Sequence, residues 1–131
     1  MFIDASALSA ILLAEPEADK FAGLIDRAPV KLTSSIAIFE AALALRRQRA
    51  HSTEVARALV MRLIVGAKID IAPLGALEGD IALEAFERFG KGRHPARLNM
   101  GDCFAYACAR THGVPLLFKG DDFGLTDIDS A

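Results

Sequence analysis

The sequence has 131 residues, of which 53% are hydrophobic and 24% charged, and its formal net charge is −2. This length favours a single domain over residues 1–131 with a sizeable core. No apolar run approaches the roughly 20 residues of a membrane span, and the first apolar residues lack the basic segment of a signal peptide. Cys103 and Cys108 do not have the spacing of a CxxC pair, so we expect a cytoplasmic protein without disulfides or membrane contact.

Apolar spacing, capping residues and helix breakers predict strands that alternate with helices. Strands are expected at residues 1–4, 30–33, 69–71, 115–118 and 125–128, and helices at about 5–14, 17–27, 35–49, 53–65, 77–89 and 100–111. The expected N-caps are Ser34 or Ser35, Ser52 or Thr53, and Asn99, and Gly66 and Gly113 are expected to end helices. This order predicts an α/β fold with a central, mainly parallel sheet of about five short strands, flanked by helices on both faces.

Four acidic side chains interrupt otherwise apolar segments, namely Asp4, Glu40, Asp102 and Asp122. A carboxylate is rarely buried without a compensating partner, and Lys119 is the one cation close in sequence to any of them. In open α/β sheets, ligands bind beyond the carboxyl ends of the strands. Asp4 and Asp122 follow strands, and Asp102 lies in a first helical turn, so these three are expected at one edge of the sheet.

Glu40 is the hardest of the four acids to explain by local structure. Its neighbours three and four residues away are all apolar, which predicts that it lies on the inward face of its helix. Simpler explanations stay open for each acid taken alone. Glu40 could reach solvent, Asp4 and Asp102 could cap helices, and Asp122 could belong, with Asp121, to a turn.

The ligand types indicate which metal such a site would bind. No His or Cys lies near the four acids in sequence, which disfavours zinc. Carboxylate oxygens alone suit Mg²⁺ or Mn²⁺, which can activate a water and stabilise charge on a leaving oxygen. One shared divalent cation would compensate all four acids, and metal-assisted phosphodiester hydrolysis is the reaction class that needs this arrangement.

Four segments of the chain together resemble the PIN-domain ribonucleases, and within them the VapC-type toxins of bacterial toxin–antitoxin pairs. The segments are residues 2–7 (FIDASA), 34–40 (SSIAIFE), 98–107 (LNMGDCFAYA) and 116–128 (LLFKGDDFGLTDI). The resemblance implies a PIN-like fold and a Mg²⁺- or Mn²⁺-dependent endoribonuclease. It also implies an RNA substrate, a cognate antitoxin as inhibitor, and a homodimer.

The resemblance assigns site roles to individual residues. Asp4 and Asp102 would hold the metal, directly or through water, while Glu40 and the fourth acid complete the pocket and orient the attacking water. Asp122 is favoured over Asp121 as that fourth acid. Ser6 matches the small hydroxyl residue near the first acid. It could hydrogen-bond a ligand or phosphate, or it could be an ordinary serine of a first helical turn.

The basic residues suggest where RNA would bind. With the four acids set aside as ligands, 15 Lys and Arg residues face 13 remaining acids out of 17. Arg93, His94, Arg97 and Asn99 precede Asp102 and could contact RNA, although basic groups also occur as solvated helix ends. There is no Trp, and most of the eight Phe residues have core spacing, so recognition by shape and backbone is favoured over stacking on exposed rings.

Two other functions remain possible at this level. A PIN-like module could bind RNA or protein without cleaving it, although the presence of all four acids argues against that. A Mg²⁺-dependent phosphotransfer domain also gathers acids around a metal. One class of such domains needs an Asp-x-Asp motif after the first strand, whereas this chain has Asp4-Ala5-Ser6.

Overall fold

A parallel four-stranded sheet forms the centre of the computed structural model, which describes residues 1–131. The strands are β1 (Phe2–Ile3), β2 (Leu32–Ser34), β3 (Asp70–Ala72) and β4 (Leu116–Leu117), in the order β3-β2-β1-β4. β1 lies between β2 and β4, with Phe2 in register with both Leu32 and Leu116. The predicted α/β architecture with a parallel sheet is therefore confirmed.

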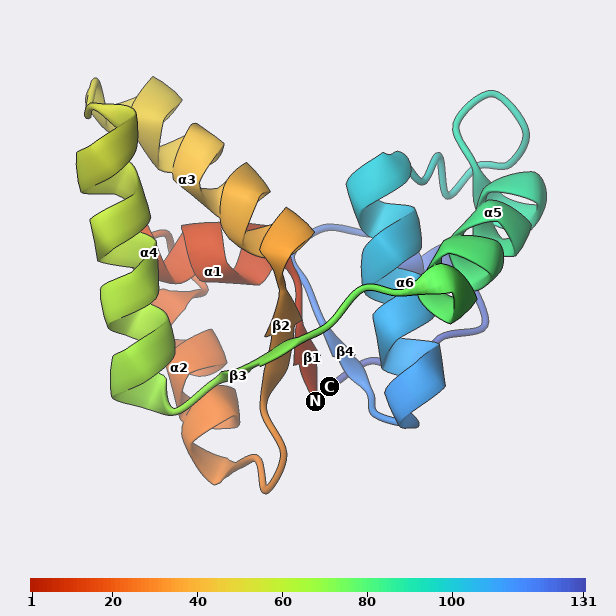
Figure 1. Ribbon diagram of the computed structural model, residues 1–131, viewed down its shortest axis with the longest axis horizontal. Helices are drawn as coiled ribbons and strands as arrows, with labels where there is room; N and C mark the ends of the chain where they lie inside the picture. Colours follow the sequence, from red (N-terminus) through yellow and green to blue (C-terminus); the bar gives the residue numbers. More distant parts are fainter.

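Six α-helices cover the two faces of this sheet (Figure 1). They are α1 (Ala5–Leu12), α2 (Ala18–Arg27), α3 (Ser35–Arg49), α4 (Thr53–Ala67), α5 (Ala76–Phe89) and α6 (Met100–His112). Helices α1 to α4 lie on one side, and α5 and α6 lie on the other. None of the six has the length and apolarity that a membrane crossing requires.

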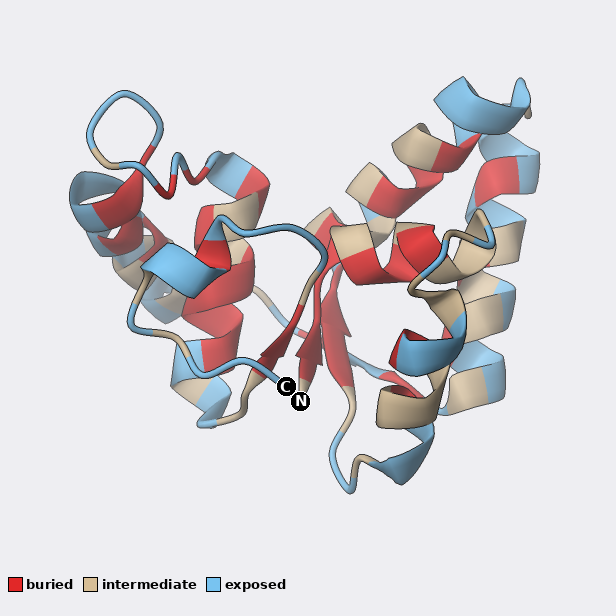
Figure 2. Ribbon diagram, turned by 180° about the vertical axis from the view of Figure 1, so that it is seen from behind, coloured by how far each residue is buried: buried red, intermediate tan, exposed pale blue.

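Each face of the sheet has its own hydrophobic core. Successive side chains of a strand point to opposite faces, so Phe2 joins the core under α5 and α6 and Ile3 joins the core under α1 to α4. Figure 2 shows the buried residues concentrated on the strands and on the helix surfaces that face them. Both cysteines are buried and free.

The predicted helix boundaries are largely correct. Ser34, Ser52 and Asn99 cap α3, α4 and α6 through side-chain oxygens that accept backbone N–H groups. Gly113 ends α6 with a left-handed backbone at φ 60°. The prediction that Gly66 ends α4 is wrong, because the helix continues to Ala67 and Lys68 takes the left-handed conformation.

The sheet has four strands and not the predicted five. Residues 123–125 form the 3₁₀ turn η1 (Phe123–Leu125), in which the Thr126 hydroxyl donates to the Phe123 carbonyl at 2.7 Å. This turn takes the place of the strand expected at 125–128, and among the residues after η1 only Ser130 makes an isolated parallel bridge, to Leu116.

The apolar spacing in the sequence predicts an inward face of α5 that includes Leu83, Ala85 and Phe86, and this prediction is partly wrong. Leu83 and Phe86 are exposed, whereas Ala82, Ala85 and Phe89 are buried. Small alanine side chains let α5 approach α6 closely, and the larger side chains are left at the surface. The helix is therefore rotated from the orientation that its largest apolar residues predict.

Candidate functional site

Asp4 lies at the junction between β1 and α1, at the carboxyl edge of the sheet. It is 4% exposed and is the one charged residue among the buried residues. Its Oδ2 accepts hydrogen bonds from the Ser6 N–H at 2.9 Å and the Ser6 hydroxyl at 2.5 Å. Burial raises the pKa of Asp4, although the bonds from Ser6 oppose this shift. Asp4 therefore serves as the N-cap of α1, and it remains a buried carboxylate without a cation.

Ser6 connects this junction to the end of the neighbouring strand. While its hydroxyl donates to Asp4, its Oγ accepts the Lys119 backbone N–H at 3.0 Å. Lys119 follows β4, so a single serine fixes the carboxyl ends of β1 and β4 relative to each other. In this structure Ser6 positions Asp4, and its contact with a ligand or phosphate stays a prediction.

Glu40 points from α3 toward the other acids. Its neighbours in space raise its pKa to about 7, first through burial and then through the charges of Asp4 and Asp102. The carboxylate packs against Gly101 in the first turn of α6. A Cβ at that position would lie 2.2 Å from the Glu40 Oε2. Glu40 can occupy this place only because residue 101 has no side chain.

Asp102 is fixed by its own helix. Its Oδ2 accepts the Asn99 N–H at 2.8 Å, and its N–H donates to the Asn99 Oδ1 at 3.0 Å, which is a capping box. The capping role that the sequence left open is therefore real. The pKa of Asp102 is raised to about 6, mainly by burial and also by the charges of Asp4 and Asp122, while the hydrogen bond from Asn99 opposes this shift.

Asp122 is the acid of the Asp121-Asp122 pair that faces Asp102. It precedes η1, and its carboxylate makes no capping hydrogen bond. It lines a cavity of about 290 Å³ with Asp102, Asn99, Lys91 and Arg97, whereas Asp121 does not line this cavity. This placement favours Asp122 as the fourth acid, and its role stays a prediction.

The first three acids share a second cavity. Asp4, Glu40 and Asp102, which come from three different elements, line a space of about 420 Å³. Asp102 and Asn99 line this cavity as well as the one beside Asp122. We call the two adjoining spaces the acidic cavity. Its acids come from distant parts of the sequence and meet at the carboxyl edge of the sheet, as the topology predicted.

No cation of the protein compensates these acids. Lys119, the candidate suggested by the sequence, contacts Glu15 at 2.6 Å and Glu17 at 3.4 Å instead. No three His, Cys, Asp or Glu side chains are close enough together to coordinate one ion, so a single ion held directly by all four acids does not fit. Mg²⁺ is usually bound by one or two carboxylates with retained waters, and the oxygen donors here suit that mode.

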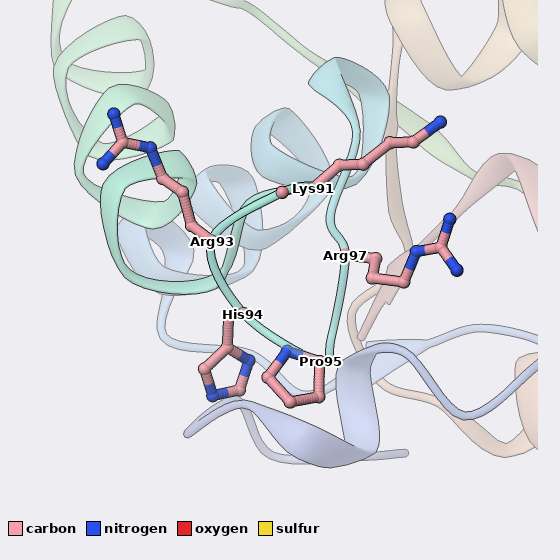
Figure 3. Close-up of a pocket in the computed structure, with 6 residues that line it drawn as sticks. Lys91, Arg93, His94, Pro95 and Arg97 are labelled. Atoms are coloured by element: carbon pink, nitrogen blue, oxygen red, sulfur yellow. The ribbon is translucent and has the colours of Figure 1, made fainter.

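The basic loop between α5 and α6 separates its cations onto two sides (Figure 3). Lys91 and Arg97 extend to one side and line the acidic cavity beside Asp102 and Asp122, without any ion pair. Arg97 has a left-handed backbone, at φ 53°. Of the four residues predicted to contact RNA, only Arg97 and Asn99 line this cavity, and the Asn99 side chain also serves as the cap of α6.

The other two predicted RNA contacts lie elsewhere. Arg93 points away from Arg97 and pairs with Glu87 at 2.8 Å. His94 accepts the Ala96 N–H at 3.1 Å, and its ring packs edge-on against Phe89 at 5.3 Å. Neither residue lines the acidic cavity, but both line a neighbouring cavity with Lys91 and Arg97, so their contact with RNA stays a prediction.

Sequence reasoning missed three residues that border the acids. Gly101 makes room for Glu40, Lys91 lines the cavity, and Arg47 of α3 lines it from the far side. Lys91 and Arg47 were visible only as members of basic groups, and the sequence could not show which members turn toward the acids. Phe39 is 63% exposed, so at least one ring that could stack on a base lies at the surface beside the acids.

Comparisons with known proteins agree with this geometry. Residues 1–128 match the family model described as "PIN domain". Ribonuclease VapC30 of Mycobacterium tuberculosis is 40% identical over 128 residues, which cover 98% of this chain and 95% of the relative. Ribonuclease VapC of Mycolicibacterium smegmatis is 41% identical, over 98% and 97% of the two chains. The crystal structure of Mycobacterium tuberculosis VapC20, described as a Sarcin-Ricin loop cleaving toxin, shares the fold with a TM-score of 0.78 at 19% identity, covering 99% and 97%.

Proposed function

The chain belongs to the PIN domain family and, within it, to the VapC ribonucleases, and on this premise we propose that it is a metal-dependent endoribonuclease toxin. The observation that carries the proposal is the acidic cavity. Asp4, Glu40 and Asp102 line it together, two of them with strongly raised pKa values, and no cation of the protein is paired with any of them. Buried carboxylates without a cation are unfavourable when ionised, and a cation from solution would stabilise their ionised form.

Asp4 and Asp102 would hold Mg²⁺ or Mn²⁺ in this proposal. When bound, such an ion lowers the pKa of a water molecule and stabilises charge on the leaving oxygen. Asp102 would offer its Oδ1, since its Oδ2 already accepts the Asn99 N–H. Ser6 keeps Asp4 oriented through two hydrogen bonds to Oδ2.

Glu40 and Asp122 would complete the cavity on either side of this pair. Burial and the charges of Asp4 and Asp102 raise the pKa of Glu40 to about 7 in the metal-free protein, so its carboxylate can accept and release a proton near neutral pH. It would orient the attacking water and accept a hydrogen bond from it. Lys91 and Arg97 would contact the RNA backbone beside Asp122, where both line the same cavity.

The proposal also includes biological partners. Relatives at about 40% identity are VapC proteins, so we propose a cognate antitoxin as inhibitor and a homodimer as the assembled form. We place the protein in the cytoplasm, where its two free, buried cysteines would stay reduced.

The test compares RNA cleavage by the parent protein and by Asp4→Asn. Total cellular RNA is incubated with each protein in Mg²⁺, in Mn²⁺ and after chelation, and the cut ends are mapped. Asn retains the capping oxygen at position 4, so the variant should fold normally and lose cleavage. Asp26→Asn, at an exposed site on α2, is the matched control and should cleave like the parent. Cleavage by Asp4→Asn at the parent rate, or undiminished parent activity after chelation, would refute a metal-dependent nuclease.

A further inference from the structure

We propose that α3 carries a subsite for single-stranded RNA, in which a nucleobase stacks on Phe39 and the adjoining backbone contacts Arg46 and Arg47. The subsite adjoins the acidic cavity, so the proposal rests on the proposed ribonuclease function and extends it. It assigns a substrate-binding role to residues outside the acids.

Phe39 is placed as a surface ring and not as a core residue. It is 63% exposed and belongs to neither hydrophobic core. The ring lies in the second turn of α3 and makes no aromatic or cation–π contact within the protein. Aromatic rings that stack on bases provide a large share of the affinity of proteins for single-stranded nucleic acid.

A cavity of about 350 Å³ lies over this ring. It is lined by Phe39, Glu40, Leu43, Arg46 and Arg47. Residues 39, 43, 46 and 47 follow the helical spacing that places side chains along one stripe, over about 12 Å of helix at 1.5 Å per residue. Glu40 and Arg47 also line the acidic cavity, so the two spaces adjoin through these side chains.

The two arginines are unpaired. Neither Arg46 nor Arg47 makes an ion pair or a side-chain hydrogen bond, whereas the nearby Arg49 donates to the Leu13 carbonyl at 3.1 Å. Guanidinium groups that share a cavity with an exposed ring match the chemistry of a base and the backbone phosphates of the same strand. Only two apolar side chains, Phe39 and Leu43, line the cavity, which is little for a protein interface.

A second pair of cations without ion pairs indicates the path of the RNA strand across the site. Lys91 and Arg97 border the acidic cavity beside Asp122, while Arg47 borders it from α3. An RNA strand bound at both borders of the acidic cavity would pass over Asp4 and Asp102. Phe39 would then bind a base a short distance from the phosphate that is cleaved.

Binding is measured in the Asp4→Asn background, so that the RNA stays intact. A fluorescently labelled single-stranded RNA is titrated with this protein and with the same protein carrying Phe39→Ala or Phe39→Trp. Stacking energies predict that Phe39→Ala weakens binding by about 5-fold to 100-fold. Leu83→Ala, which removes an apolar side chain that is 70% exposed on α5, is the matched control and should bind like the background.

Phe39→Trp gives a direct signal because the chain has no other tryptophan. Stacking of a base on the new indole should quench its fluorescence as RNA binds. Replacing Arg46 and Arg47 together by Gln should also reduce the slope of log affinity against log salt by about 1.4, at roughly 0.7 for each phosphate contact to a single strand.

The result that overturns the subsite is unchanged RNA affinity in Phe39→Ala together with an unquenched indole in Phe39→Trp. A change of oligomeric state in Phe39→Ala, with RNA affinity unchanged, would likewise overturn it and assign the surface to a protein partner. These failures leave the ribonuclease proposal intact if the parent protein cleaves RNA. A parent that binds RNA with stacking but never cleaves it would refute the nuclease and retain the subsite.

Discussion

Glu40 and Asp102 bring carboxylates to the same cavity in opposite ways. Asp102 is held by a capping box with Asn99, three residues away in the sequence. The Glu40 carboxylate has no hydrogen-bond partner and is placed by the packing of α3 against a glycine of α6. A locally held acid keeps its position even when its surroundings change. The position of Glu40 depends instead on the absence of a side chain at Gly101, which lies 61 positions later in the chain.

The largest expected effect concerns Asp102, which has both a structural and a chemical role. Asp102→Asn keeps an oxygen that can accept the Asn99 N–H, whereas Asp102→Ala does not. We expect both variants to lose roughly 100-fold or more of RNA cleavage, because both lack the carboxylate. Only the alanine variant should also lose about 1 kcal/mol of folding free energy. Cleavage assays and urea unfolding measure the two effects, and equal stability of the two variants would contradict the capping role.

Gly101→Ala tests how Glu40 is positioned. The added methyl group would overlap the Glu40 carboxylate, which can move away because it ends a flexible side chain. We expect cleavage to fall by about 10-fold to 100-fold, since small misplacements of reacting groups are costly. The fold should be unharmed, or more stable by up to about 1 kcal/mol, because alanine favours a helix over glycine.

Gly79→Ala provides the control for that substitution. Gly79 also lies inside a helix, α5, and an added Cβ there meets nothing within 4 Å. This variant should gain stability to a similar degree and cleave RNA like the parent. If Gly101→Ala cleaves normally, the placement of Glu40 against residue 101 has no part in catalysis.

The pH dependence of folding stability tests the raised pKa values of the acids in the acidic cavity. The folded-state pKa of Glu40 is about 7 against a usual value of 4.5, so between these values the folded state binds more protons than the unfolded state. Stability of the metal-free protein should therefore fall as pH rises from about 4.5 to 7, by about 2 kcal/mol after allowance for solvent screening. Asp102, with a pKa of about 6, acts in the same direction.

Urea unfolding of chelator-treated protein at pH 5 and pH 8 measures this loss. Glu40→Gln should remove most of it, because glutamine carries no charge at either pH. Added Mg²⁺ should raise stability at pH 8, since an ion that binds only the folded state stabilises it. A metal-free protein that becomes more stable between pH 5 and pH 8 would contradict the burial of uncompensated charge in the cavity.

The contrast between Glu40 and Asp102 also marks how far the sequence could predict the site. Asn99 and Asp102 form a local pattern, so the helix start and the capping alternative could be read directly. The inward direction of Glu40 followed from its apolar neighbours, but its contact with Gly101 depends on how α3 packs against α6. The directions of Lys91, Arg93 and Arg97 depend on the backbone of one loop, and no periodicity encodes them.

The fold shows the same division between local and tertiary information. Strand and helix order could be predicted because caps, glycines and apolar spacing act locally. The prediction of a fifth strand was wrong because the Thr126 hydroxyl stabilises a turn at a segment with strand-like composition. The predicted inward face of α5 was partly wrong because Ala82 and Ala85 pack closely on α6 and leave the bulkier Leu83 in solvent. Packing of small residues across helices cannot be inferred from hydrophobicity alone.

The smallest expected effect concerns an acid that the protein compensates fully. Asp127 accepts the Tyr106 hydroxyl at 2.6 Å and an Arg88 N–H at 2.8 Å, and these partners lower its pKa, with Tyr106 contributing most. Tyr106→Phe should cost about 1 kcal/mol of stability and leave cleavage unchanged, because this network lies away from the acidic cavity. Urea unfolding and a cleavage assay check both parts. A large loss of cleavage in Tyr106→Phe would show that the chain beyond β4 helps to position Asp122, and that this acid depends on tertiary packing as Glu40 does.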